Sequence, residues 1–103
     1  MGSETVLAGR FSGVIKRAYR SADGRHYFNF TFRDNGNRID IHCSRHPSLA
    51  GRDADVNKTH LYSSGRICFV SGQEPTSQAR AEQLAKQWAE YFLSYRRTGR
   101  TQS

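Results

Sequence analysis

The segment at residues 27–33 alternates strictly between apolar and polar side chains, and it constrains the fold more than any other part of the sequence. A period of two is typical of a β-strand with one buried face. The buried face is expected to carry Phe28, Phe30 and Phe32, and the exposed face Asn29, Thr31 and Arg33. A strand with three phenylalanines on one side requires a sheet around it and a second layer that covers that side.

Two further segments supply the rest of the sheet. Residues 11–19 and 38–44 also alternate, and the connections between the three segments contain Asp23-Gly24 and Asn35-Gly36. Asn-Gly provides the positive φ angles that a tight hairpin turn needs. The pattern therefore predicts an antiparallel β-meander of three to four strands with one apolar face, and Cys43 is expected on that face.

The second layer is predicted at residues 77–97. Apolar side chains recur there at helical spacing and form one stripe, which comprises Ala81, Leu84, Ala85, Trp88, Phe92 and Tyr95. Ser77 is suited to cap the start of this helix, and Gly99 its end. The predicted fold class is therefore α+β: a meander, a long irregular loop at residues 47–72, and one long C-terminal helix packed on the sheet.

The chain of 103 residues is expected to form a single domain, with an ordered core at about residues 6–99 and short flexible termini. No apolar run approaches the ~20 residues that span a bilayer, so we expect no membrane association. Two cysteines without an export signal indicate free thiols in a reducing compartment, and we expect the protein to be cytoplasmic.

The net charge is +7, and thirteen of the sixteen basic residues are arginine. Such an excess favours anionic partners, because the planar guanidinium group recognises phosphates and carboxylates through paired hydrogen bonds. The candidate anion-binding residues lie beside aromatic residues in two segments, and they are Lys16, Arg17, Arg20, Arg96 and Arg97. A solvated basic surface is the simpler interpretation, and a nucleic acid or an acidic protein partner is the alternative.

Cysteine and histidine are the other residues that could carry chemistry. The set of His42, Cys43, His46, His60 and Cys68 lacks the paired ligand spacings of a zinc finger, so we expect no metal and no cofactor. A thiol protease would need a histidine that a third group orients beside the cysteine, and the chain is short for such an enzyme.

The most specific motif is Tyr62-x-x-Gly65-x-Ile67-Cys68. It resembles the active-site segment of ubiquitin-conjugating enzymes, in which the same four residue types have this spacing. The sequence is most similar to the compact bacterial relatives of these enzymes. Those relatives carry His-x-Tyr before the glycine, as His60-Leu61-Tyr62 does, and a later tryptophan helix that ends in Thr-Gly, as Trp88 and Thr98-Gly99 do. The resemblance spans roughly residues 10–99.

This resemblance implies a UBC-like fold and a thioester transferase. Cys68 would accept the C-terminal carboxyl group of a ubiquitin-like modifier from an activating enzyme and pass it to an amine. His60 falls where the family has an asparagine that supports the developing oxyanion. Tyr62 and Gly65 would shape the loop, and Arg66 would contact a partner.

Two alternatives stay open. The chain could be a non-catalytic basic module on the same fold, or a conjugating fold that only docks a partner. The turn also matters, because a regular two-residue turn at Ser64-Gly65 would place Leu61 opposite Cys68 and direct His60 to the other face. A catalytic role for His60 therefore requires an irregular segment here.

Overall fold

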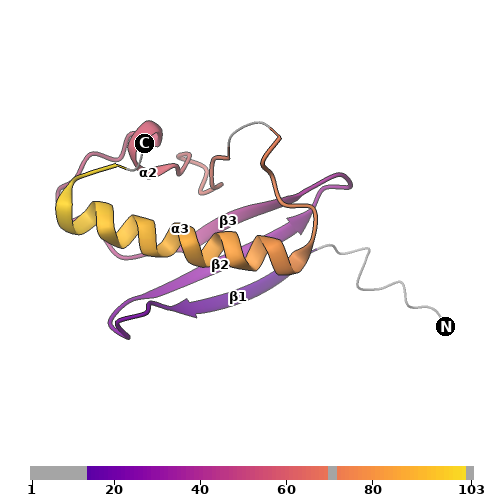
Figure 1. The fold of residues 1–103 in the computed structure, drawn as a ribbon, viewed down its shortest axis with the longest axis horizontal. Coiled ribbons are helices and arrows are strands. Elements are labelled where there is room, and N and C mark those ends of the chain that lie inside the picture. Colours follow the sequence, from indigo (N-terminus) through magenta and orange to yellow (C-terminus); the bar gives the residue numbers. More distant parts are fainter. Residues whose placement is uncertain (1–13, 70–71, 102–103) are drawn as a thin grey trace.

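Antiparallel pairing joins β1 (Val14–Arg20), β2 (Tyr27–Asp34) and β3 (Ile39–Arg45) into one sheet with β2 at its centre. The computed structural model describes residues 14–69 and 72–101. Figure 1 shows the long helix α3 (Gln78–Thr98) lying across one face of this sheet, with the short helix α2 (Val56–Thr59) beside it. The α+β architecture predicted from the sequence is confirmed. Residues 11–13 of the expected first strand, and the expected start of the core at residue 6, lie outside the described residues.

The core forms between the three phenylalanines of β2 and the apolar stripe of α3. Phe28, Phe30 and Phe32 are each at most 2% exposed. Phe28 meets Trp88 and Phe92 edge to face, with ring centroids 6.0 and 5.9 Å apart. Such pairs add about 0.5–1.5 kcal/mol each beyond the burial of their surface. The prediction that the three phenylalanines of β2 share one buried face is therefore confirmed, and this face packs against α3.

Both caps of α3 are where the sequence predicts them. The Ser77 hydroxyl accepts a hydrogen bond from the Arg80 amide at 3.2 Å. Gly99 adopts the left-handed conformation, with φ at 73°, and donates its amide to the Tyr95 carbonyl. The Arg52 guanidinium adds bonds to the carbonyls of Arg96 and Arg97, at 3.2 and 3.1 Å, which lack helical partners of their own. No helix within the described part of the chain is long and apolar enough to cross a membrane.

The segment expected to be an irregular loop contains more structure than the sequence suggests. It includes the helix α2 and a small hairpin, in which Leu61 pairs with Ile67. The hairpin also pairs with the outer edge of β3, through His42 and Arg66. A four-residue helix and two isolated pairs are too short to produce a periodic signal, and they are therefore invisible to pattern analysis.

Burial of ionisable groups on the helix-facing side of the sheet makes the fold sensitive to base. Cys43 is 5% exposed, and this burial raises the pKa of its thiol from 9.0 to about 12. Burial, together with a hydrogen bond to Glu90, likewise raises the pKa of Tyr19 from 10.0 to about 12. The unfolded chain releases both protons at lower pH than the folded chain, so the free energy of unfolding falls as the pH rises from about 9 to about 12.

We predict that Cys43→Val removes part of this loss, because valine fills a similar volume and cannot ionise. Urea denaturation at about pH 7 and about pH 10.5 measures the effect. The loss between the two pH values should be smaller in the variant by about 2 kcal/mol. An equal loss in both proteins would show that Cys43 does not carry the pH dependence.

Candidate functional site

The hairpin that carries Cys68 turns through three residues rather than two. The Tyr62 amide donates to the Arg66 carbonyl at 2.9 Å, the Gly65 amide donates to the Tyr62 carbonyl, and Gly65 has φ at 93°. This combination is a turn followed by a glycine bulge, which shifts the pairing by one residue relative to a two-residue turn. His60 therefore lies opposite Cys68, whose amide donates to the His60 carbonyl at 2.8 Å. The two-residue turn considered from the sequence is wrong, and the irregularity that a role for His60 requires is present.

The second half of the hairpin is fixed to the sheet. The Cys43 amide donates to the Gly65 carbonyl, and the Ile67 amide donates to the Ile41 carbonyl, both at 2.8 Å. The Ile67 side chain is 2% exposed and belongs to the core cluster. Cys68 follows directly after this buried anchor, at the point where the chain leaves the sheet, and its side chain is partly exposed.

His60 is held by the end of α2. The Asp55 carboxylate caps the start of this helix by accepting the Asn57 amide at 2.8 Å, and His60 caps its end with φ at 56°. Histidine adopts this left-handed conformation more readily than most residues with a side chain. The imidazole ring packs 5.2 Å from the ring of Tyr91 on α3. The backbone and the ring of His60 are thus both anchored.

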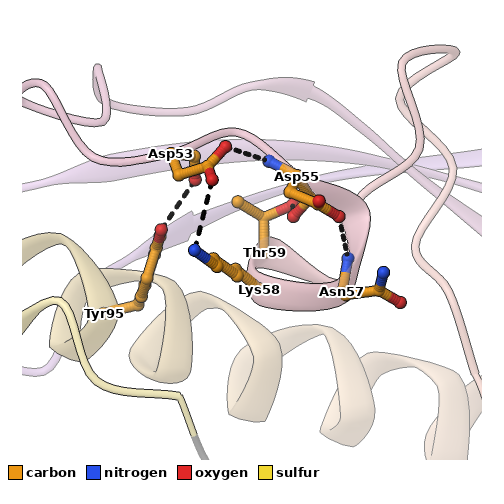
Figure 2. A network of polar contacts seen from close by, with 6 residues as sticks. All are labelled: Asp53, Asp55, Asn57, Lys58, Thr59 and Tyr95. Carbon is orange, nitrogen blue, oxygen red and sulfur yellow. Dashed lines mark hydrogen bonds and ion pairs between the residues drawn. The ribbon is translucent and has the colours of Figure 1, made fainter.

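Three aromatic side chains of α3 fasten the segment that leads into His60. Trp88 Nε1 donates to the Thr59 carbonyl at 2.9 Å, and the Tyr91 hydroxyl donates to the Lys58 carbonyl. Figure 2 shows the third bond, from the Tyr95 hydroxyl to the Asp53 carbonyl, at 2.7 Å. It also shows the Asp53 carboxylate receiving Lys58 Nζ and the Asp55 amide, at 3.2 and 3.0 Å. The hydrogen bond from the Asp55 amide lowers the pKa of Asp53 most, and the bond from Lys58 lowers it further, so this carboxylate stays charged.

His60 and Cys68 line one open groove of about 270 Å³ against α3. Its other lining residues are Ile67, Phe69, Leu84, Gln87, Trp88 and Tyr91. The wall that α3 contributes is mostly apolar, so a group attached to the Cys68 sulfur would contact apolar side chains. In the sequence Leu84 and Trp88 indicated only a core stripe, and Gln87 and Tyr91 were not singled out as lining a site, because spacing along a helix does not reveal which part of its surface a loop leaves uncovered.

Tyr62 and Arg66 lie on the same side of the hairpin as Cys68. The Arg66 guanidinium carbon is 4.9 Å from the centre of the Tyr62 ring, in a cation–π contact. A hydrogen bond with the Cys68 thiol raises the pKa of the Tyr62 hydroxyl, and the nearby Arg66 charge acts in the opposite direction. The Tyr62 hydroxyl therefore lies within electrostatic reach of the sulfur, in addition to the part that Tyr62 plays in the loop.

A second and larger cavity, of about 760 Å³, adjoins the turn of the hairpin. Its walls come from the end of β3, the loop before α2, the hairpin turn and α3, and they include Cys43, His46, Leu49 and Phe92. The His46 ring lies 4.9 Å from the Phe92 ring, and its Nδ1 contacts the Pro47 carbonyl at 2.7 Å. Nothing in the sequence indicated this cavity, because its walls come from four separate segments.

The five candidate anion-binding residues do not form one patch. Lys16 and Arg20 lie on the sheet face opposite α3, whereas Arg17 faces α3 and pairs with Glu82 at 3.6 Å. Arg96 and Arg97 lie at the C-terminal end of α3, where Arg96 Nε donates to the Ser48 carbonyl at 2.8 Å. Among the described residues, no three side chains of histidine, cysteine, aspartate or glutamate come together in a group that could hold a metal ion.

We predict that Gly65→Ala destabilises the hairpin more than Gly36→Ala destabilises its own turn. Both glycines have positive φ, at 93° and 84°, so each alanine carries backbone strain of about 1 kcal/mol. Only at position 65 would the new Cβ also meet a neighbour, the Cys43 carbonyl at 3.2 Å. Urea denaturation followed by Trp88 fluorescence should give a larger loss for Gly65→Ala. Equal losses would show that the bulge is not held tightly against β3.

Comparison of the chain with protein-family models, with curated proteins and with solved structures found no match. The features that bear on function are therefore those of the chain itself: a partly exposed thiol on a bulged hairpin, a histidine opposite it, and a groove between them and α3.

Proposed function

We propose that the protein is a ubiquitin-conjugating-like carrier, in which Cys68 holds a ubiquitin-like modifier as a thioester and transfers it to an amine. The observation that carries this proposal is the register of the hairpin. It sets His60 opposite Cys68 in one open groove, whereas the other thiol, Cys43, is buried with a raised pKa. The Tyr62-x-x-Gly65-x-Ile67-Cys68 motif supports the same assignment.

The loading step exchanges one thioester for another. The Cys68 thiolate attacks the carbonyl carbon of a modifier that an activating enzyme holds as a thioester. The new carbon–sulfur bond forms as the bond to the donor sulfur breaks, and the donor sulfur leaves as a thiolate. The exchange needs no oxidant or reductant. During it, negative charge develops on the carbonyl oxygen, and a ring N–H of His60 can donate to that oxygen whether the imidazole is neutral or protonated.

The second step moves the acyl group to nitrogen. A neutral amine attacks the carbonyl carbon, the Cys68 sulfur leaves as a thiolate, and the amine loses a proton to solvent as the amide forms. The Tyr62 hydroxyl, whose pKa is raised by the nearby Cys68, can stabilise the departing sulfur by donating its hydrogen. The apolar side chains of Leu84 and Trp88 border the groove and would limit the access of water to the thioester.

We expect native protein to react with N-ethylmaleimide at Cys68 at least tenfold faster than at Cys43. The reason is that Cys68 is partly exposed, whereas burial keeps Cys43 protonated and out of reach. Mass spectrometry of tryptic peptides resolves the two sites, and the same protein in denaturant provides the fully reactive reference. If both thiols resist modification until the protein unfolds, Cys68 is a packing residue and the proposal fails.

Acyl transfer itself can be tested with a glycine-terminated peptide thioester of mercaptoethanesulfonate. Wild-type protein should gain the mass of one acyl group at Cys68, and neutral hydroxylamine should remove it. Cys68→Ala should gain none. Transfer from the loaded protein to free lysine should slow on the order of 10–100-fold in His60→Ala, because one donor to the oxyanion is lost.

Two further variants make this result specific. His60→Asn keeps an N–H donor and should retain most of the rate, and His26→Ala removes a histidine of the first connection that is remote from the groove. A rate in His60→Ala equal to that of His26→Ala would exclude the oxyanion role. Partner binding without any acylation of Cys68 would instead identify the fold as a docking module.

A further inference from the structure

The face of the sheet opposite α3 is uncovered within residues 14–69 and 72–101. Both helices pack on the phenylalanine side, so the alternating residues of each strand are left pointing away from the core. We call this surface the open face, and its residues are Val14, Lys16, Ala18, Arg20, Tyr27, Asn29, Thr31, Arg33, Asp40, His42 and Ser44, with Arg66 added by its pairing with His42. Apart from its edges, this face carries no large apolar side chain.

The open face is positively charged. Lys16, Arg20, Arg33 and Arg66 contribute four cations. Its one strand carboxylate, Asp40, is already paired with Arg38 at 3.0 Å, and Glu74 lies near Arg66 at the margin. The Lys16 and Arg33 side chains make no hydrogen bond or ion pair with any other described residue. These cations are thus available to an anion from outside.

Two arginine–tyrosine pairs border the open face, one where β1 and β2 are joined and the other along the outer edge of β3. Tyr27 and Tyr62 are the large hydrophobic residues that the described structure leaves exposed, at 57% and 38%. Each has a guanidinium group over its ring, Arg20 at 5.6 Å and Arg66 at 4.9 Å from the ring centre. Arg20 Nε also donates to the Gly24 carbonyl at 3.1 Å, so its plane is fixed before any ligand arrives.

The distance between the two arginine–tyrosine pairs is one that a short extended chain of a few units could span. Tyr27 lies four residues along β2 from Thr31, which pairs with His42, and His42 pairs with Arg66. At ~3.3 Å per residue and ~4.8 Å per strand, the pairs are about 16 Å apart. Small polar side chains, Asn29, Thr31 and Ser44, occupy the surface between them.

We propose that the open face binds single-stranded nucleic acid. Planar guanidinium and tyrosine groups offer stacking surfaces for bases, and the other two cations of this face, Lys16 and Arg33, can pair with phosphates of the same strand. An acidic protein would use the cations but has no need of two exposed rings with arginine over each. Tyr62 adjoins both this surface and Cys68, but none of the four cations lines the Cys68 groove, so this proposal does not depend on acyl transfer.

Fluorescence anisotropy with labelled dT12, U12 and a 12-base-pair duplex tests the proposal at about 50 mM salt. Both single strands should bind more tightly than the duplex. The tighter binder of dT12 and U12 then shows whether the surface prefers DNA or RNA. Lys16→Gln/Arg33→Gln should weaken binding at least tenfold and reduce the salt slope by about 1.4, at about 0.7 per lost phosphate contact. Tyr27→Ala should weaken binding about tenfold through lost stacking.

A matched control distinguishes a specific nucleic-acid site from non-specific attraction to the net positive charge of the protein. Arg80→Gln/Lys86→Gln removes the same two charges from exposed positions on α3, and it should change the affinity less than twofold. Binding is measured without any acyl donor, so a failure of the thioester proposal leaves this result unaffected. The proposal is overturned if both double variants lose equal affinity, if the duplex binds as well as the single strands, or if poly-glutamate competes as well as dT12.

Discussion

The row of hydrogen bonds from α3 to the backbone of residues 53–59 is the interaction on which the rest of the structure depends. Trp88, Tyr91 and Tyr95 bury their rings on the core side and direct their polar atoms at the carbonyls of Thr59, Lys58 and Asp53. The Trp88 bond is buried, and a buried carbonyl without a partner costs about 1–3 kcal/mol, so this bond holds the loop as well as the helix. The same side chains that close the core therefore also set the position of α2 and, through its end, of His60.

The candidate site results from two supports that approach the hairpin from opposite sides. From one side α2 fixes His60, and from the other β3 fixes Gly65 and Ile67. Cys68 lies just past both supports, and its side chain is exposed in part. A thiol in this position is oriented without being buried, in contrast to Cys43, whose side chain is enclosed by the core. This difference between two cysteines of one small chain underlies the proposed thioester chemistry.

The fold could be predicted from the sequence where a pattern repeats, and the site could be predicted only in part. The phenylalanines of β2, the stripe of α3 and its caps at Ser77 and Gly99 each follow from local spacing. The facing of His60 and Cys68 does not, because it depends on whether Gly65 forms part of a two-residue turn or a bulge after a longer one, and both suit Ser-Ser-Gly. Tyr91 was also missed, since its role is to satisfy a carbonyl of a distant loop.

The pairing of the hairpin with β3 also has a consequence for the edge of the sheet. An outer strand with unpaired amides and carbonyls is a template for association with other chains. In β3 the amides of Ile39 and Cys43, and the carbonyl of Ile41, are occupied by Pro75, Gly65 and Ile67. The segment that presents Cys68 therefore also shields an isoleucine-rich edge from aggregation. Mutations that loosen this segment would reduce the amount of usable protein as well as the reactivity of the thiol.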